Sequence, residues 1–342
     1  MSPHGDVTNT GSCSIAKAGS TDRYASIRPT AVREYVAREG VTSMKRDRNF
    51  TWRRIDPASL DLQGMKMAIV GGTGGIGRAL SRFMASRGAD VIVVGRTFRD
   101  SDVLRIEFIK ADLSLMREAK RVGEILLAKT LDIVVFTTGI FAAPKRQETA
   151  EGIERDMAVS YLSRLVILRE IAPRLATTRR AAPMKPRVFV MGYPGTGQAG
   201  MLDNLNGEKS YSATPVHMNT VAGNEMLVLD AAKRYPNVNV FGLNPGLLKT
   251  EIRNNFLGEG TLRSRFVEWM IGLVNPSVET YAERLTPLLV SPDLEAHSGA
   301  MFDQKGNAIL PSPKLRDATY VTAFIAASEA LVAARANVRV SA

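Results

Sequence analysis

The residues of this 342-residue chain that most directly suggest chemistry form a glycine-rich run. The run reads Gly72-Thr73-Gly74-Gly75-Ile76-Gly77 and fits the pattern G-x-G-x-x-G. In this pattern the first glycine permits a tight turn, the second lets the backbone approach a pyrophosphate, and the third lets a helix pack closely on a strand. The N–H groups at the start of that helix then face the phosphates. Because the run follows an expected strand and opens an expected helix, it predicts a dinucleotide-binding site.

A guanidinium group follows the next expected strand, Val91 to Val94. In dinucleotide-binding domains an acidic residue near this point holds the adenosine ribose hydroxyls and favours NAD. This chain has Arg96 there instead, with Arg99 close behind. A guanidinium binds a 2′-phosphate through charged, often bidentate hydrogen bonds. We therefore predict NADP(H) as the cofactor, with NAD(H) as the weaker ligand. The alternative is that both arginines are solvated loop residues.

Together with later motifs, these residues resemble the short-chain dehydrogenase/reductase family over about Gly64 to Leu310. The later motifs are Asp112-Leu113, Thr137-Thr138-Gly139 at a strand end, and the run from Pro245 to Thr250. The resemblance implies NAD(P)-dependent oxidoreductase chemistry on alcohols or carbonyls. It places Asp112 at the adenine, Gly139 along the cofactor, and Pro245-Gly246 with Thr250 beside the nicotinamide carboxamide. The residues assigned to the cofactor are Gly71, Gly72, Thr73, Gly74, Gly75, Ile76, Gly77, Arg96, Asp112, Leu113, Thr138, Gly139, Pro245, Gly246 and Thr250.

The positions that carry catalysis in the resembled family are filled by other residues in this chain. The family uses Asn, Ser, Tyr and Lys, with the tyrosine four residues before the lysine, and none of the eight tyrosines here has a lysine at that spacing. Counting back along the expected helix places His217 at the tyrosine position and Val221 at the lysine position. Ser160 falls at the asparagine position, and the serine position reads Met191-Gly192-Tyr193. His217, Ser160 and Tyr193 are therefore the candidate catalytic residues.

Three interpretations of this substituted site are open. In the first, the chain is an oxidoreductase whose proton donor is His217, since an unperturbed imidazole titrates near about pH 6.5. Ser160, Tyr193 or Tyr211 would then supply a second hydrogen bond. In the second, the chain binds the cofactor but catalyses a non-redox reaction such as an isomerisation. In the third, it is a cofactor-sensing regulator, and His217 caps a helix or packs in the core. We take the first interpretation as the leading one.

The substrate is expected to be small and apolar. In the resembled family the segment after the Pro245 turn forms a lid over the substrate. Here that segment, Leu262 to Val274, contains Phe266, Trp269 and Met270. Aromatic and methionine side chains suit an apolar ligand, although they could equally pack on the core.

The elements that must hold these residues alternate between short apolar strands and helices. Strands of continuous Val and Ile are buried on both faces, and their alternation with helices implies right-handed crossovers. The pattern predicts a single α/β domain with a doubly wound parallel sheet of Rossmann type, in three α/β/α layers. The expected strands are Met65 to Val70, Val91 to Val94, Arg105 to Ile109, Asp132 to Phe136, Arg187 to Met191, Val238 to Leu243 and Ala300 to Phe302. The expected helices are Gly75 to Arg87, Met116 to Lys129, Glu151 to Leu175, Thr220 to Arg234 and Thr280 to Leu289.

The ends of the chain differ from this alternating region. Residues 1–62 open with Ser, Thr, Gly and Asn and then carry many arginines, so we expect a basic extension that is partly disordered. A short helix within it could span Pro29 to Glu39. The expected domain boundaries are therefore residues 1–62 for the extension, 63–312 for the nucleotide-binding domain, and 313–342 for a C-terminal helical segment.

Composition limits the classes of partner. Hydrophobic residues make up 45% of the chain, enough for a large core. The net charge of +11 and the pI of about 9.9 could indicate an anionic partner or merely a basic surface. No block of Lys and Arg is interleaved with aromatic residues, so we expect no nucleic-acid partner. No apolar run reaches the roughly 18 residues of a membrane span, so we expect no membrane partner.

Cysteine and histidine content bears on location and metal binding. The single cysteine, Cys13, cannot form an intramolecular disulfide, and the three histidines lie in no cluster with zinc spacing. We therefore predict no metal site and a reducing, cytoplasmic location. The helices expected over Glu151 to Leu175 and Thr220 to Arg234 have apolar stripes. In the resembled family such helices pair between subunits, which implies a homo-dimer or homo-tetramer.

Overall fold

The computed structural model describes residues 44–175, 184–246 and 277–336. All of them belong to the second of the chain's two compact units, Thr42–Ala342. Three sequence-based expectations lie outside the described residues: the helix at residues 29–39, the apolar segment at residues 262–274, and Thr250 as a cofactor contact.

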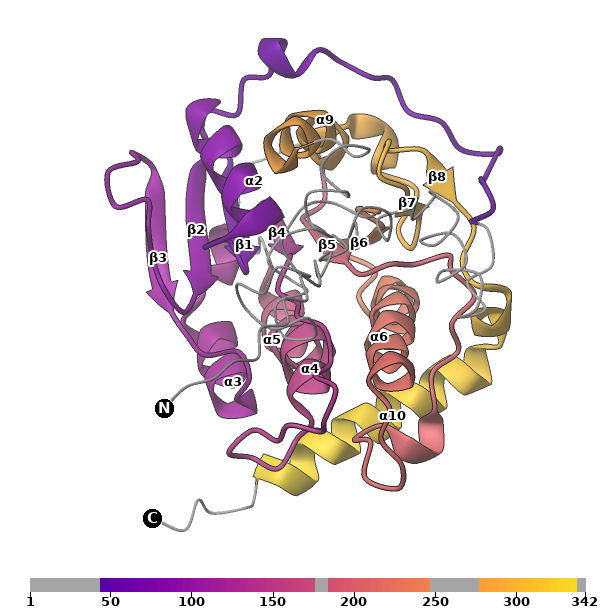
Figure 1. Cartoon of the computed structure of the whole chain (residues 1–342). Coiled ribbons are helices and arrows are strands. Elements are labelled where there is room, and N and C mark those ends of the chain that lie inside the picture. The colour runs from indigo at the N-terminus through magenta and orange to yellow at the C-terminus, as the bar shows by residue number, and fades with distance from the viewer. Residues whose placement is uncertain (1–43, 176–183, 247–276, 337–342) are drawn as a thin grey trace, which may run out of the picture. The chain divides into compact units, whose positions relative to one another are not determined.

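An eight-stranded sheet organises this unit, in the order β3-β2-β1-β4-β5-β6-β7-β8 (Figure 1). All neighbouring strands are parallel except β7 and β8. The chain leaves β1 toward β2 and β3 and then returns to place β4 on the other side of β1, so the strand order reverses between β1 and β4. In such sheets ligands bind outside the carboxyl ends of the strands at this reversal. The strands are β1 (Lys66–Val70), β2 (Asp90–Gly95), β3 (Ile106–Lys110), β4 (Ile133–Phe136), β5 (Arg187–Met191), β6 (Asn239–Leu243), β7 (Met301–Phe302) and β8 (Ala308–Ile309).

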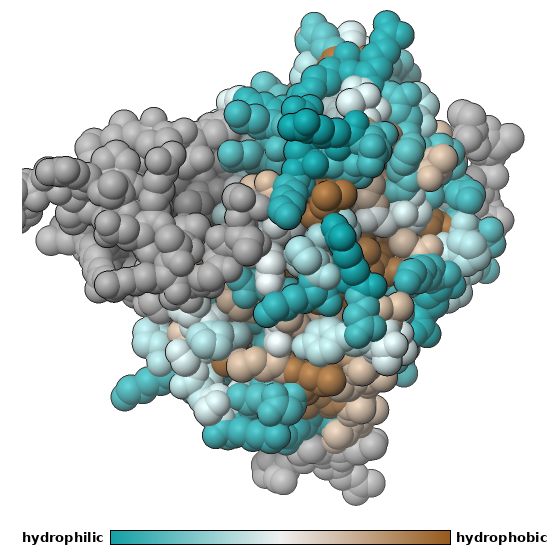
Figure 2. All heavy atoms as spheres, turned by 90° about the vertical axis from the view of Figure 1, so that its right-hand side faces the viewer, coloured by the Kyte–Doolittle hydropathy of each residue, from teal (hydrophilic) through white to brown (hydrophobic). Residues whose placement is uncertain are grey.

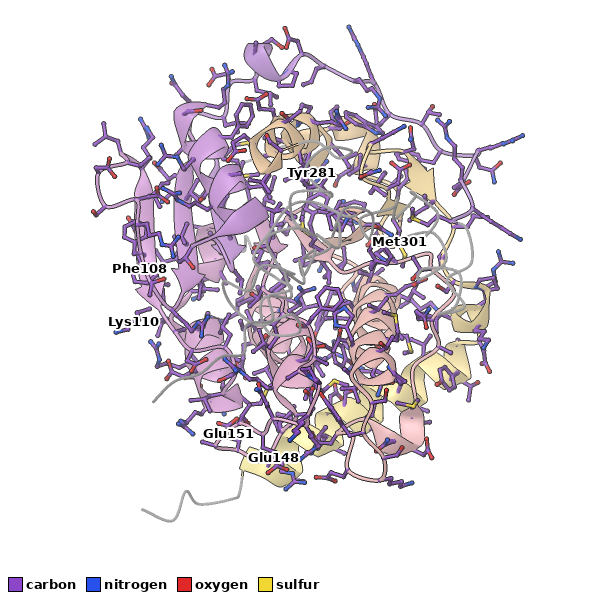
Figure 3. All side chains as sticks on the ribbon, in the orientation of Figure 1. Phe108, Lys110, Glu148, Glu151, Tyr281 and Met301 are labelled. Carbon is purple, nitrogen blue, oxygen red and sulfur yellow. The ribbon has the colours of Figure 1, made fainter. Side chains whose placement is uncertain are left out.

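Alternate residues of the strands point into two hydrophobic cores, one on each face of the sheet. In β1, Ala68 and Val70 join a core with α3, α5, α6 and α10, whereas Met67 and Ile69 join a core with α2 and α9. Tyr281 of α9 belongs to the second core (Figure 3). The sheet is thus covered on both faces, and the predicted doubly wound α/β fold is confirmed. The main helices are α2 (Gly75–Ser86), α3 (Met116–Ile125), α5 (Ser163–Ile171), α6 (Ala213–Arg234), α9 (Val278–Val290) and α10 (Ala318–Ala336).

Two expected helices differ from those in the structure. The helix expected from Thr220 starts seven residues earlier, since α6 begins at Ala213 and includes His217 in its second turn. The helix expected over Glu151 to Leu175 is composite: α4 (Arg155–Met157) continues through a π-helical stretch, η3 (Ala158–Leu162), into α5. Glu151 lies before this helix and accepts the N–H of Met116 at 2.5 Å, which joins the loop to the start of α3 (Figure 3). π-Helical turns often occur at functional sites.

Residues 44–62, which the sequence assigned to the extension, pack on this unit. Phe50 and Leu62 are buried in the core that contains α2 and α9. The indole of Trp52 donates to the carbonyl of Gly306 at 2.7 Å, and Arg46 forms a bridge with Ile309 of β8. Strand β8 was not expected from the sequence. This segment is therefore held at the edge of the sheet by β8 and the turn before it.

Helix α10 packs across α6 on the same side of the sheet as α3 and α5 (Figure 1). Phe324 is fully buried, and the hydroxyl of Tyr161 donates to Ser328 at 3.0 Å. Arg169 of α5 forms an ion pair with Glu329 at 2.7 Å. Helix α10 of the same chain therefore covers part of the outer surface of α5 and α6. The sequence-based expectation that these two helices pair between subunits stays a prediction.

Hydrophilic side chains separate small hydrophobic patches on the face of the unit that carries β8 (Figure 2). None of the helices in the described ranges is long and apolar enough to cross a lipid bilayer.

Candidate active site

The glycine run forms the turn between β1 and α2, where small residues are required by close contacts. Gly71 has a φ of 96°, and a Cβ there would lie 2.5 Å from the nitrogen of Thr138. A Cβ on Gly77 would lie 2.4 Å from the carbonyl oxygen of Gly71. The tight turn therefore uses Gly71, whereas the sequence pattern assigned it to Gly72. Gly77 lets α2 approach the end of β1, as the pattern predicted.

The start of α2 is open to a ligand. A Cβ built on Gly74 meets nothing within 4 Å, and the helix has no side chain that caps its first N–H groups among the described residues. Uncapped N–H groups at the positive end of a helix of this length bind anions. Gly75 starts the helix with a φ of 48°, and Thr73 and Ile76 complete the loop. These residues fit the pyrophosphate of a dinucleotide.

Arg96 lies beside this loop. Gly95 ends β2 so close to the loop that a Cβ on it would lie 2.6 Å from the side chain of Thr73. Arg96 follows directly and is exposed. The next acidic residue, Asp100, is buried and bound at 2.7 Å by Arg78 of α2, which holds the pKa of Asp100 below its usual value. Asp100 is thus occupied, and the loop after β2 presents the guanidinium groups of Arg96 and Arg99 to the solvent.

The ends of β3 and β4 hold further expected cofactor residues. Asp112 is exposed after β3 and accepts the N–H of Ser114 at 3.0 Å, while Leu113 beside it is buried. The hydroxyls of Thr137 and Thr138 both donate to the carbonyl of Val70 at 3.1 Å. The strand ends of β1 and β4 are therefore tied together, with Gly139 following at the reversal of strand order.

A hydrogen-bonded network connects α6 with the composite helix over Arg155–Ile171. The Nδ1 atom of His217 lies 2.7 Å from Oδ2 of Asp156, which is fully buried. Ser160 donates to Oδ1 of the same carboxylate at 2.5 Å and accepts the N–H of Ile140, after β4, at 3.0 Å. Two of the three candidate catalytic residues, Ser160 and His217, are therefore joined through Asp156.

The other ring nitrogen of His217, Nε2, has no hydrogen-bond partner in the part of the chain that the structure describes. Phe141 stacks on the imidazole with ring centroids 4.0 Å apart and an interplanar angle of 19°. The ring is thus held by a hydrogen bond at one edge and a phenyl group on one face. An imidazole oriented by a carboxylate at Nδ1 can exchange a proton through Nε2.

The two tyrosines considered at this site are placed differently. Tyr211 donates its hydroxyl to the carbonyl of Ala143 at 2.6 Å, and burial together with Glu154 and Asp156 raises its pKa to about 12. It is therefore a poor proton donor. Tyr193 lies half-buried in the loop after β5, where its carbonyl accepts the hydroxyl of Thr196 at 3.0 Å.

A buried cation lies below the carboxyl ends of β4 and β5. Arg164 of α5 donates to the carbonyls of Thr138 and Met191, the latter at 2.5 Å, and to the side chain of Asn224 at 2.9 Å. Burial lowers the pKa of its guanidinium to about 9, an effect that Asp156 partly opposes. The side chain of Asn224 also donates to the carbonyl of Ser160 at 2.9 Å.

Two buried glutamates have raised pKa values near these networks. Glu154 caps α4 by accepting the N–H of Met157 at 2.7 Å, and burial raises its pKa to about 7. Burial also raises the pKa of Glu225, whose carboxylate accepts the hydroxyl of Ser312 at 2.8 Å and the N–H of Gly195 at 3.1 Å. Glu225 therefore anchors the loop after β5, while Glu154 lies two residues from Asp156.

The turn after β6 is the last expected cofactor contact in the described residues. Gly246 has a φ of 67° and donates its N–H to Asn244 at 3.0 Å; it follows the half-buried Pro245. A Cβ on Gly246 would lie 2.4 Å from Oε1 of Gln304. That oxygen is buried without a hydrogen-bond partner among the described residues. It is an acceptor that an amide NH2 group of a ligand could satisfy.

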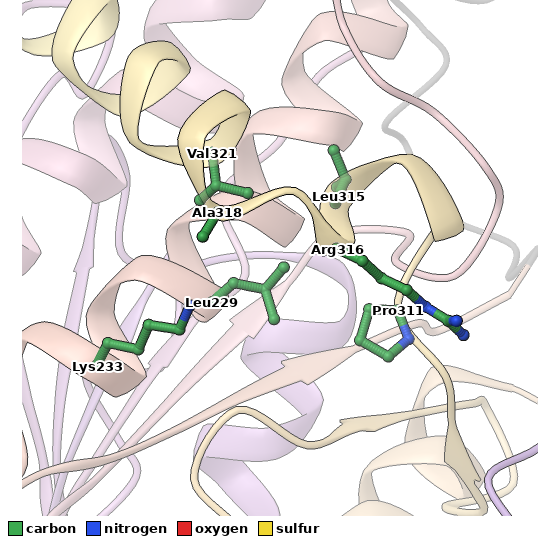
Figure 4. Close-up of a pocket in the computed structure, with 7 residues that line it drawn as sticks. All are labelled: Leu229, Lys233, Pro311, Leu315, Arg316, Ala318 and Val321. Carbon is green, nitrogen blue, oxygen red and sulfur yellow. The ribbon is translucent and has the colours of Figure 1, made fainter.

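A pocket of about 230 Å³ lies elsewhere, between α6 and α10 (Figure 4). It is lined by Leu229, Lys233, Leu315 and Arg316 among others. Leu229 is twelve residues beyond His217 on the same helix, which corresponds to about 18 Å along its axis. The pocket is therefore separate from the candidate active site.

Sequence reasoning missed three residues of this site: Asp156, Arg164 and Phe141. Asp156, Ser160 and Arg164 follow one another at intervals of four, the spacing that places side chains on one helical face. That spacing was the available signal. Phe141 had none, since a single aromatic residue in a loop has no periodicity.

Comparisons with known proteins identify the family of this chain. A family model described as short chain dehydrogenase matches residues 66–259. An uncharacterized oxidoreductase of Saccharomyces cerevisiae is 51% identical over 292 residues, which cover 84% of this chain and 94% of the yeast protein. A polyprenol dehydrogenase of Mus musculus is 26% identical over 272 residues, or 74% of this chain and 79% of the mouse protein.

A solved structure of a Serratia marcescens short-chain dehydrogenase/reductase shares the fold. Its TM-score is 0.53 at 20% identity, and the match covers 72% of this chain and 99% of the bacterial one. The family model extends across the glycine turn, the strand ends and the helix that carries His217. The chain therefore belongs to the short-chain dehydrogenase family of oxidoreductases.

Proposed function

We propose that this protein is an NADP(H)-dependent oxidoreductase that interconverts a carbonyl and an alcohol, with His217 exchanging the proton at the substrate oxygen. The observation that carries the proposal is the 2.7 Å contact between Nδ1 of His217 and the buried carboxylate of Asp156. That contact leaves Nε2 as the nitrogen from which a proton can move. The His217–Asp156 pair would take the place of the family's catalytic tyrosine and lysine, since no tyrosine of this chain has a lysine four residues after it.

The glycine turn before α2 and Arg96 would hold NADPH, which when bound would supply a hydride to the carbonyl carbon in the direction of reduction. His217 donates a proton from Nε2 to the carbonyl oxygen, so the C=O bond becomes CH–OH. Asp156 accepts the hydrogen bond from Nδ1 and stabilises the imidazolium before the transfer. In the reverse direction, the same nitrogen removes the proton of the alcohol. Such positioned acid–base catalysis typically contributes about 10²- to 10⁴-fold to a rate.

Ser160 has an orienting role in this scheme. Its hydroxyl fixes one oxygen of Asp156 at 2.5 Å, so the other oxygen faces His217. Its own oxygen accepts from the N–H of Ile140, which ties the network to the end of β4. The acid–base pair is thereby set relative to the strand end where the cofactor is proposed to lie.

The choice of NADP(H) over NAD(H) is supported by Arg96, an exposed guanidinium beside the phosphate loop where an acid would favour NAD. An apolar substrate is supported by the composition of residues 262–274. The mouse relative is named a polyprenol dehydrogenase, and a polyprenol is apolar, which agrees with the expected polarity of the substrate but not with its expected small size.

The test combines binding and turnover. Binding of NADPH is followed by tryptophan fluorescence, and turnover with a panel of apolar ketones and aldehydes by the absorbance of the reduced nicotinamide. We expect turnover by the wild type and a loss of about 10²-fold or more in kcat for His217→Ala. Asp156→Asn should lower kcat by about 10- to 100-fold without weakening NADPH binding, because it removes a hydrogen bond to a charged group.

His297→Ala is the matched control, since His297 packs against Phe50 with ring centroids 4.1 Å apart, away from the network. Turnover that survives in His217→Ala at the wild-type level would reject His217 as the proton donor. Tight NADPH binding with no turnover across a broad panel would favour the second candidate, a non-redox cofactor-binding protein. That alternative is favoured by Val221, a buried apolar residue at the position of the usual lysine.

A further inference from the structure

Arg164 is a cation buried at the edge of the sheet where the cofactor is proposed to bind. Only 3% of the surface of Arg164 is exposed to solvent. The guanidinium donates to the carbonyls of Thr138, just beyond β4, and Met191, the last residue of β5. Its third partner is the neutral side chain of Asn224, and its Nε has no partner among the described residues. All of its hydrogen-bond partners among the described residues are therefore neutral, while Asp156 stabilises the charge without a hydrogen bond to it.

Such an arrangement is costly if its only role is structural. When a buried ion has no counter-ion in contact, electrostatic attraction does not fully offset the free energy lost with its hydration. Replacing buried ions by neutral side chains of similar volume often leaves the stability of the folded protein unchanged. The carbonyl groups that Arg164 binds could be satisfied by a neutral donor such as glutamine. A role that depends on the positive charge itself would explain an arginine here.

No other cation on the neighbouring helix can supply that charge. Helix α6 has no lysine or arginine between Ala213 and Ala232. Val221, which the count along the sequence assigns to the position of the family's lysine, is buried and uncharged. Asp156, on the composite helix that carries Arg164, opposes this charge, and its oxygens are engaged by Ser160 and His217. When His217 carries the proton that it donates, the imidazolium balances the charge of Asp156, and Arg164 is left as the net positive charge at the ends of β4 and β5.

We propose that Arg164 makes this site prefer the reduced cofactor to the oxidised one; the proposal rests on the proposed function. The nicotinamide ring is neutral in NADPH and carries a positive charge in NADP+. Arg164 binds the carbonyl of Thr138, which adjoins Gly139, an expected cofactor contact. Like charges repel strongly in a poorly solvated site, so the oxidised ring is disfavoured there. Tighter binding of NADPH than of NADP+ would favour the reduction of a carbonyl over the oxidation of an alcohol.

The test measures dissociation constants for NADPH and NADP+ separately, by calorimetry on the full chain at one pH and ionic strength. Arg164→Gln removes the charge but keeps donors for the carbonyl groups, and Arg164→Lys keeps the charge. We expect the wild type to bind NADPH more tightly. In Arg164→Gln the ratio of the two constants should shift about tenfold toward NADP+, or about 1.4 kcal/mol. In Arg164→Lys it should stay within about twofold of the wild type.

Arg187 provides a matched control, because it is also a buried arginine, with 1% exposure. It starts β5, four residues before Met191, and so lies about 13 Å away along the strand. Arg187→Gln should leave the ratio unchanged even where it lowers stability. Thermal unfolding with each ligand shows that the variants are folded.

Three results would overturn the inference. One is a wild type that binds NADP+ as tightly as NADPH, which needs no variant to observe. Another is an unchanged ratio in Arg164→Gln while both ligands still bind. The third is an equal shift in Arg164→Lys and Arg164→Gln, which would show that geometry and not charge sets the ratio. Failure of the wild type to bind either ligand is a different outcome, since it removes the proposed function itself.

Discussion

Glu154 makes the stability of this protein depend on pH in a direction unusual for a glutamate. The side chain caps α4 and the residue is 1% exposed. Burial raises its pKa to about 7 from 4.5, and the charge of Asp156 adds to the effect. Since a difference of one in pKa corresponds to about 1.4 kcal/mol, the ionised carboxylate costs the folded state about 3 kcal/mol.

The sign follows from which state holds the proton more tightly. The folded chain holds the proton of Glu154 more tightly than the unfolded chain. The contribution of the protonated carboxyl to the free energy of unfolding is therefore complete below pH 4.5 and is lost as the pH rises through about 7. Glu154→Gln cannot ionise, and its amide oxygen can still accept the N–H of Met157. The variant should therefore match the wild type near pH 4.5 and exceed it by about 3 kcal/mol above about pH 8.

Urea denaturation of both proteins at intervals from pH 4.5 to 8.5 measures this difference. Glu124→Gln is the control, because Glu124 is an exposed glutamate on α3. Its curve should follow that of the wild type at every pH. Parallel curves for Glu154→Gln and the wild type would refute the reasoning, since they would mean that the carboxyl titrates alike in the folded and unfolded chains.

Two further predictions concern the cofactor and the C-terminal helix. Arg96→Asp should weaken NADPH binding at least tenfold more than NADH binding, because it removes a charged hydrogen bond to the 2′-phosphate; equal losses in calorimetry would discredit the assignment. Tyr161→Phe removes the buried hydrogen bond to Ser328 of α10, which measures 3.0 Å, and should lower the free energy of unfolding by about 1 kcal/mol. A double-mutant cycle with Ser328→Ala checks the second effect, and additive losses would contradict it.

The sequence determined the fold because its signals are local and repeated. Most of the parallel strands are short apolar runs that contain Val or Ile, and a helix follows most of them. The bounds expected for the strand at Arg187 to Met191 agree with β5, and the other expected parallel strands agree within one residue at each end. The glycine run could also be predicted from the sequence, since a tight turn and a helix packed closely on a strand leave no room for a Cβ.

The boundaries of elements that depend on tertiary packing could not be predicted from the sequence. Helix α6 begins at Ala213, seven residues before the start expected from the sequence. Its first turns are held by neighbours such as Asn204, whose carbonyl accepts from Asn219 at 3.4 Å. Strand β8 consists of two residues, too few to show periodicity. Both depend on segments far away in the sequence.

The chemistry of the site divides in the same way. The sequence led to His217 and Ser160 as candidates, because they could be matched by counting to positions of the resembled family. Only the tertiary structure joined His217 to Asp156, 61 residues away, and brought Arg164 to the ends of two strands. The physical reason is that a side chain's type limits which bonds it can make, whereas its partner is chosen by which backbone segments the packed sheet and helices bring within about 3 Å.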